Sequence, residues 1–139
     1  MAEAGLKGTA ARARPLSPHM QVWRWHVTMA ASILTRATGI ALYGGALAAT
    51  LWFTTLMIGP DLFNPYVALL GSPLGKIALF GITFSVFYHL AAGLRHLAFD
   101  VGLGFSPRMA SLTAVAAMAF AIVASLMVWF IAWRTGGLT

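Results

Sequence analysis

An uncharged run in this 139-residue chain extends from Ala37 to Pro60, with no Lys, Arg, Asp or Glu among its 24 positions. A transmembrane α-helix needs ~20 consecutive, mostly apolar residues. The run is therefore long enough to cross a bilayer with some tilt. A segment of this kind restricts the chain to folds that place it in lipid.

The composition supports a membrane location, because 60% of the residues are hydrophobic and only 9% are charged. Soluble domains carry roughly 25% charged residues. The chain has no cysteine, so it cannot by itself supply a disulfide, a thiolate metal site or the ligands of an iron–sulfur cluster.

Two further apolar segments follow the first. The second lies around the 18 positions between Lys76 and Arg95, and the third ends at the anchoring residues Trp133 and Arg134. The third begins with an alanine-rich stretch near Ala114 that favours tight helix packing. We predict an all-α membrane protein with one anchor domain over 1–139, in which three transmembrane helices, at about 28–58, 74–99 and 109–133, form a bundle.

The segments outside these spans have distinct compositions. Residues 1–27 are expected to form a cytoplasmic and interfacial N-terminal segment, with Trp23 and Trp25 at the headgroup level. A loop is expected from Gly59 to Pro73, because Pro60 and Pro65 disfavour helix continuation.

The cations lie unequally on the two sides of such a bundle. The N-terminal side and the second loop hold seven, whereas the first loop and the tail hold two, Lys76 and Arg134. The positive-inside rule then places the N-terminus inside. A net charge of +6 fits topology and contact with anionic lipid, and we expect no nucleic-acid partner.

Ionisable side chains crowd the end of the second span, from His89 to Asp100. Such groups within membrane-length segments indicate a functional site. His89 is expected ~9 Å deeper than Arg95, at ~1.5 Å per residue. His89, Gly93 and His96 share a helix face, and Gly93 leaves room beside it for a flat or bulky group.

Ser32 and Arg36 are expected at the same side of the membrane, at the start of the first span, where their spacing puts them on one helix face. A neutral imidazole at His89 can ligate haem iron, but a helix-to-helix hydrogen bond is an equal alternative. The ordinary roles of the others are an interfacial histidine for His96, topology anchors for Arg36 and Arg95, and a back-bonded serine for Ser32. His19 and His26 are expected at the surface.

The spacing of the two histidines limits any haem site. His89 and His96 are ~10 Å apart along one helix at ~1.5 Å per residue, too far to ligate both faces of one iron. A second histidine ligand would have to come from another chain. The chain also has no dinucleotide-binding glycine motif, so a redox role implies soluble partner subunits.

Two motifs resemble those of a known family, the cytochrome b556 subunits of succinate dehydrogenase, respiratory complex II. The pattern HxxxGLRHLxFDxG begins at His89, and RPL at Arg14 precedes SILTRATG, which begins at Ser32. The resemblance covers nearly the whole chain. One departure is Thr35, because the family usually has histidine at this position, near the haem propionates or the quinone pocket.

The resemblance implies a haem b-binding membrane anchor that has no catalytic residues of its own and helps to form a ubiquinone-reduction site. His89 would be the axial haem ligand, Arg36 and His96 would lie near the propionates, and Ser32 and Arg36 would border the ubiquinone pocket. The implied partners are an iron–sulfur subunit, a flavoprotein and a second membrane anchor that supplies the other haem ligand.

The implied location is the bacterial inner membrane, with the mitochondrial inner membrane as the alternative. A purely structural anchor without haem, in a related fumarate reductase-type complex, is the competing interpretation of the chain.

Overall fold

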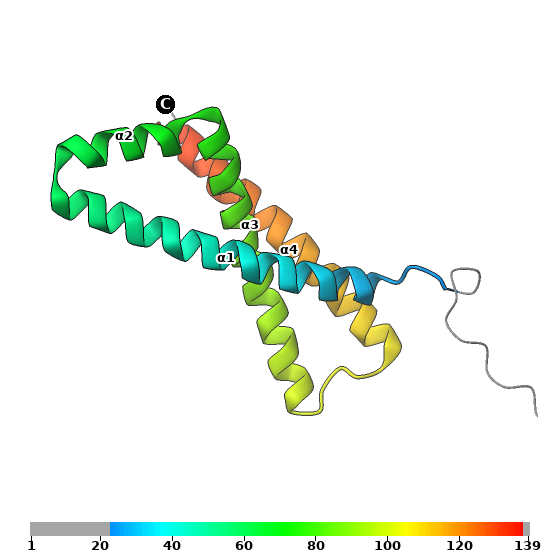
Figure 1. Cartoon of the computed structure of the whole chain (residues 1–139). Helices are drawn as coiled ribbons and strands as arrows, with labels where there is room; N and C mark the ends of the chain where they lie inside the picture. The colour runs from blue at the N-terminus through cyan, green and yellow to red at the C-terminus, as the bar shows by residue number, and fades with distance from the viewer. Residues whose placement is uncertain (1–22, 138–139) are drawn as a thin grey trace, which may run out of the picture.

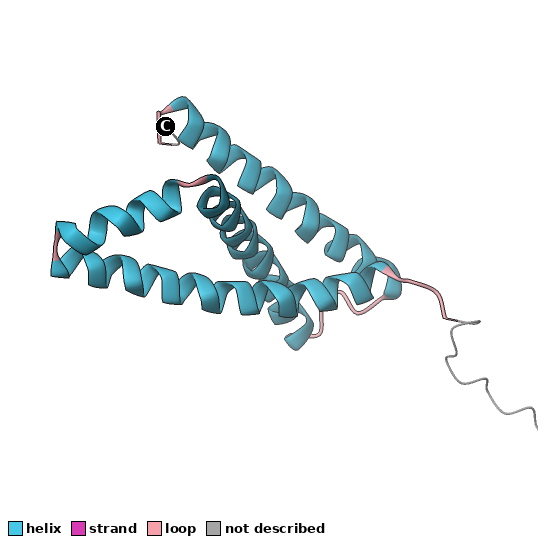
Figure 2. Ribbon diagram, turned by 45° about the horizontal axis from the view of Figure 1, so that its top comes forward, coloured by secondary structure: helices cyan, strands magenta, loops and turns pink. Residues whose placement is uncertain are grey.

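The structure is a computed structural model that describes residues 23–137. Four helices follow one another in the chain: α1 (Val27–Ile58), α2 (Pro60–Gly71), α3 (Pro73–Asp100) and α4 (Pro107–Arg134). The described residues include no strand, as Figure 2 shows. In Figure 1, α1 crosses α3, while α4 runs beside α3.

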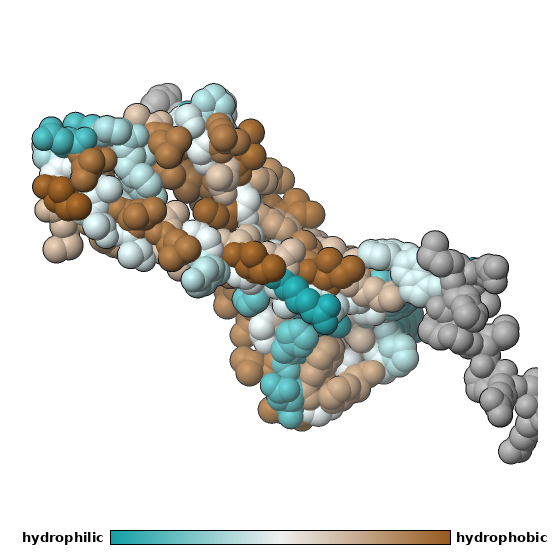
Figure 3. Space-filling model, viewed as in Figure 1, coloured by the Kyte–Doolittle hydropathy of each residue, from teal (hydrophilic) through white to brown (hydrophobic). Residues whose placement is uncertain are grey.

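Three of the helices, α1, α3 and α4, are long and apolar enough to cross a membrane. The predicted all-α fold with three spans is therefore confirmed. Apolar side chains cover much of the molecular face in Figure 3, with hydrophilic residues gathered near the α1–α2 corner and where α1 crosses α3. A surface of this kind suits a lipid environment or partner helices rather than water.

Serine–proline pairs start two of the spans. Ser72 Oγ accepts a hydrogen bond from the Gly75 backbone nitrogen at 3.1 Å, and Ser106 Oγ accepts one from Met109 at 3.3 Å. The residue after each serine is a proline, whose missing N–H costs nothing in the first helical turn. The N-cap of α1 is His26, whose side chain accepts from the Thr28 nitrogen.

The predicted loop between Gly59 and Pro73 is wrong, because most of it forms α2. Gly59 has φ of +132°, a conformation that L side chains rarely adopt, and it turns the chain sharply after α1. Pro60 then occupies the first position of a new helix rather than ending an old one. The Tyr66 hydroxyl donates to the Ala48 carbonyl at 2.7 Å and fixes α2 against α1.

The interior is small and rich in alanine. Tyr88, Ala92, Ala117 and Ala121 form a buried cluster between α3 and α4, which confirms the tight packing expected of the alanine-rich segment. Gly45 also permits close approach, since a Cβ there would lie 3.1 Å from Cγ2 of Ile82. Small residues therefore bring both α1 and α4 close to α3.

Of the expected N-terminal segment, residues 1–22 lie outside the described part of the chain. Residues 23–26 are non-helical, and the rings of Trp23 and Trp25 pack edge to face with centroids 5.7 Å apart.

Candidate functional site

Two side-chain hydrogen bonds connect the first half of α1 to the second half of α3. The hydroxyl of Tyr88, which is 1% exposed, donates to the Ala31 carbonyl at 2.9 Å. Two helical turns further along α1, the Thr38 hydroxyl lies 3.3 Å from Nδ1 of His89. The predicted site residues of the two helices are positioned by this crossing.

A polar hollow of about 230 Å³ opens beside the crossing. Its lining is entirely polar or charged and comes from both helices: Thr28, Ser32, Thr35, Arg36, Arg95 and His96. By contrast, a larger hollow between α1 and α3, of about 470 Å³, is lined mostly by apolar or small residues. The structure thus brings together Ser32, Arg36 and His96, as the sequence predicts.

Ser32 and Arg36 are available for a ligand. Five threonines of α1 donate to backbone carbonyls of their own helix: Thr35, Thr38, Thr50, Thr54 and Thr55. Ser32 makes no such bond within the described residues, so the expectation of a back-bonded serine is wrong. The Arg36 side chain is exposed and likewise has no hydrogen bond within 23–137.

Arg95 is engaged in the protein itself. Its Nε donates to the Thr113 hydroxyl at 3.0 Å, and its terminal nitrogen donates to the Ala110 carbonyl at 3.1 Å. Its guanidinium carbon also lies 4.6 Å from the centroid of the Phe99 ring, within cation–π range. Arg95 therefore joins α3 to α4, while Arg36 keeps its donors open toward the hollow.

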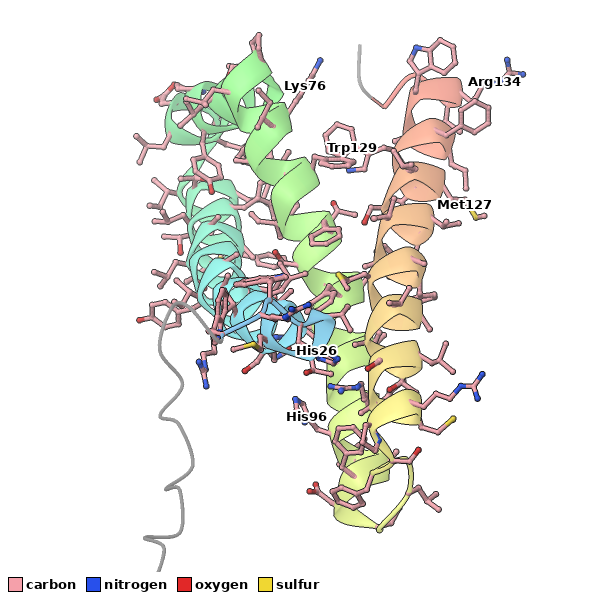
Figure 4. The ribbon with its side chains drawn as sticks, turned by 90° about the vertical axis from the view of Figure 1, so that its right-hand side faces the viewer. His26, Lys76, His96, Met127, Trp129 and Arg134 are labelled. Atoms are coloured by element: carbon pink, nitrogen blue, oxygen red, sulfur yellow. The ribbon has the colours of Figure 1, made fainter. Side chains whose placement is uncertain are left out.

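His96 is exposed at the rim of the hollow and packs edge to face on Phe99, with ring centroids 6.1 Å apart. In Figure 4, His26 and His96 lie toward one end of the molecule, and Lys76 and Arg134 lie toward the other. The two cations that the sequence assigns to one side, Lys76 and Arg134, thus lie at the same end of the molecule.

Thr35, which departs from the family pattern, lines the hollow, but its hydroxyl does not donate a hydrogen bond into the hollow. Its hydroxyl donates to the Ala31 carbonyl at 2.8 Å, the same carbonyl that receives the Tyr88 proton. The side chain can accept a hydrogen bond from a ligand, but a histidine's capacity to donate into the hollow is absent at this position.

His89 does not line the hollow and lies deeper along α3. It is half-buried, and a Cβ added to Gly39 would lie 3.3 Å from its Cε1. Every buried side-chain nitrogen or oxygen in the described residues has a hydrogen-bond partner. Nε2 of His89 has none, so this atom is accessible at the surface of the chain.

The described residues contain no cluster of three or more His, Asp, Glu or Cys side chains that could hold a bare metal ion. A single accessible imidazole nitrogen can instead serve as one axial ligand of a haem. Next to it along the helix, a Cβ at Gly93 would meet nothing within 4 Å. The space beside His89 is therefore compatible with a flat group.

Sequence reasoning missed three residues of this region: Thr28, Thr38 and Tyr88. Thr28 precedes Ser32 by four residues, so helical spacing alone could have indicated it. Tyr88 and Thr38 form hydrogen bonds with residues 57 and 51 positions away in the sequence, and no local pattern reveals such partners.

Fold and site define a class of protein, a multi-pass α-helical membrane subunit with a polar site at one end. The family model described as "Succinate dehydrogenase/Fumarate reductase transmembrane subunit" matches residues 10–128. The chain belongs to this family. It is a subunit of a multi-subunit dehydrogenase of the inner membrane, and it is not catalytic alone.

Named relatives come from bacteria and mitochondria. The chain is 39% identical to the succinate dehydrogenase cytochrome b556 subunit of Paracoccus denitrificans, over 82% of this chain and 88% of the relative. It is 31% identical to that of Rickettsia felis, over 84% and 90%. It is also 41% identical to the mitochondrial cytochrome b560 subunit of Sus scrofa, over 67% and 56%.

Proposed function

We propose that this chain is the haem b-binding anchor of a succinate:quinone oxidoreductase and that His89 is its axial haem ligand. The observation that carries the proposal is the accessible, unpartnered Nε2 of His89, on a helix whose next turn is opened by Gly93. The names of the relatives, which are cytochromes b, support the same cofactor.

Residues of the polar hollow have the chemistry to bind the propionate groups of a haem. Arg36 and His96 can bind the propionates, because a guanidinium forms short, charge-assisted hydrogen bonds with carboxylates. Haem b, when bound, would supply a one-electron redox centre whose potential depends on its axial ligands. Since Nε2 is at the surface of this chain, the second ligand belongs to a second membrane anchor subunit.

The same polar hollow can hold the head of a ubiquinone. The Ser32 hydroxyl can donate to a quinone carbonyl, and Arg36 can stabilise negative charge that develops on the quinone oxygen during reduction. A quinone carbonyl needs hydrogen-bond donors that are not already bonded to other groups of the protein. Among the residues of α1 that line the hollow, we assign this role to Ser32 and Arg36.

We include soluble partner subunits in the proposal because the sequence contains no cysteine for an iron–sulfur cluster and no dinucleotide-binding glycine motif. An iron–sulfur subunit and a flavoprotein dock at the end that carries the polar hollow, and lipids cover the apolar faces. The excess of cations puts this end, with the N-terminus, on the cytoplasmic side. In a mitochondrion it would be the matrix side.

The test of the proposal is the haem spectrum of the purified complex with His89→Gly. We expect the reduced b-type absorption band to be lost and to return, at least in part, when free imidazole is added. His26→Ala removes an exposed histidine of the same chain and should leave the band unchanged. A full band in the His89→Gly complex without imidazole would contradict the ligand assignment and favour a structural anchor, which is the competing function.

A further inference from the structure

Thr38 is the side chain that meets the inner edge of the His89 ring. It is 3% exposed, and its hydroxyl oxygen lies 2.8 Å from the Leu34 carbonyl and 3.1 Å from the Thr35 carbonyl. A hydroxyl has one proton to donate and two lone pairs to accept with. Because backbone carbonyls can only accept, the Thr38 proton is directed to them.

The contact with His89 must therefore run in the other direction. The Thr38 oxygen lies 3.3 Å from Nδ1 of His89, and with its proton committed to α1 it can only accept there. Nδ1 consequently carries the proton and donates it. In a neutral imidazole the remaining nitrogen, Nε2, then has a free lone pair, and Nε2 is the atom left accessible at the surface.

Gly39, the next residue of α1, lets the ring sit this close to the helix. A Cβ at this position would be 3.3 Å from Cε1 of His89, which is tighter than an ordinary van der Waals contact. The Thr38–Gly39 pair thus supports the Nδ1–Cε1 edge of the ring, one residue by a hydrogen bond and the other by leaving space.

We propose that Thr38 is a positioning residue that holds His89 in the Nδ1-protonated tautomer and orients the lone pair of Nε2 toward the haem iron. The inference rests on the proposed function, because it assigns His89 as the ligand. Partners that accept the second N–H of a ligating histidine fix the ring orientation and raise its basicity, and their loss commonly costs about 10–100-fold in metal affinity. A more basic imidazole stabilises oxidised over reduced iron.

The experiment is a redox titration of the haem in the purified complex with Thr38→Val, which keeps the shape and removes the acceptor. If this variant binds the oxidised haem about tenfold less tightly, relative to the reduced haem, than the wild type does, the midpoint potential of the haem rises by about 59 mV. Thr38→Ser keeps the hydroxyl and should retain the wild-type potential. Thr50→Val is the matched control, since Thr50 also donates to its own helix, at 2.8 Å to Ala46, but does not touch His89.

A second pair of variants covers the case in which Thr38→Val does not assemble. Thr38→Ser and Thr38→Cys have similar sizes, but a thiol is a weak acceptor, so the cysteine variant should have the higher potential. Equal potentials in the hydroxyl and non-hydroxyl variants would overturn the inference. If the His89→Gly complex has meanwhile lost its haem band, the proposed function stands; if it keeps the band, the proposed function fails first.

Discussion

The hydroxyl of Tyr88 donates to the carbonyl oxygen of Ala31 at 2.9 Å, across two membrane-length helices and in an almost fully buried position. The bond joins residues that are 57 positions apart and fixes where α1 crosses α3. Since His89 is the next residue along α3, the same bond fixes the depth of the proposed haem ligand relative to α1.

Removing this hydroxyl should loosen the crossing. Tyr88→Phe is expected to destabilise the subunit by about 1 kcal/mol, the net value of a typical intramolecular hydrogen bond. The loss would appear as a lower thermal transition of the purified complex. Tyr43→Phe is the control, because Tyr43 is 71% exposed. Equal transitions for the two variants would show that the Tyr88–Ala31 bond contributes no stability.

The polar hollow predicts a selective defect in quinone chemistry. A lost hydrogen bond to a charged group costs about 1.5–3 kcal/mol, so Arg36→Leu should lower kcat/KM for quinone reduction by about 10–100-fold. Ser32→Ala should lower it less. Succinate oxidation with a soluble artificial acceptor should be retained in both, because that reaction does not need the hollow.

Two variants control for general damage to the membrane domain. Ser111→Ala removes a serine whose hydroxyl donates to its own helix at Pro107, and Arg134→Leu removes a cation at the other end of the molecule. Both should keep quinone reduction. If Ser32→Ala and Arg36→Leu reduce the two assays equally, the cause is failed assembly and not a quinone site.

The α2–α3 corner should tolerate no side chain at Gly75. A Cβ there would run into the backbone carbonyl oxygens of Leu69 and Leu70, and backbone atoms cannot rotate away. Gly75→Ala is therefore expected to cost about 1–3 kcal/mol, as overpacking does elsewhere, and to lower the thermal transition of the complex. Gly71→Ala lies at the same corner with nothing within 4 Å of its Cβ; an equal loss there would refute the steric explanation.

The cation distribution predicts the orientation of the chain. Alkaline phosphatase fused after Thr139 should be active, because this enzyme works outside the cytoplasm, and a fusion at Leu103 in the α3–α4 connection should be inactive. A fluorescent protein that folds only inside should give the reverse pattern. The opposite result at both positions would mean that the cations of the N-terminal side and the second loop do not set the topology.

Sequence alone determined the three spans and predicted several residues of the candidate site. Lipid requires long uncharged runs, so the spans can be read from charge spacing alone, and helical periodicity puts Ser32 and Arg36 on one face. It also indicated His89, since an ionisable group within a span is costly. It failed at α2, because a proline after a helix is compatible both with a loop and with the first turn of a new helix. The hydrogen bond from Tyr66 to Ala48 of α1 is a tertiary contact that no local pattern reveals.

The tertiary structure decided which of these groups are free to bind a ligand. Arg36 and Arg95 look alike in the sequence, but Arg95 is bonded to α4 while Arg36 is not. Ser32 and Thr35 look alike too, but only Thr35 gives its proton to the helix. Whether a side chain is committed depends on partners from distant segments, and these are set when small residues let α1, α3 and α4 pack closely.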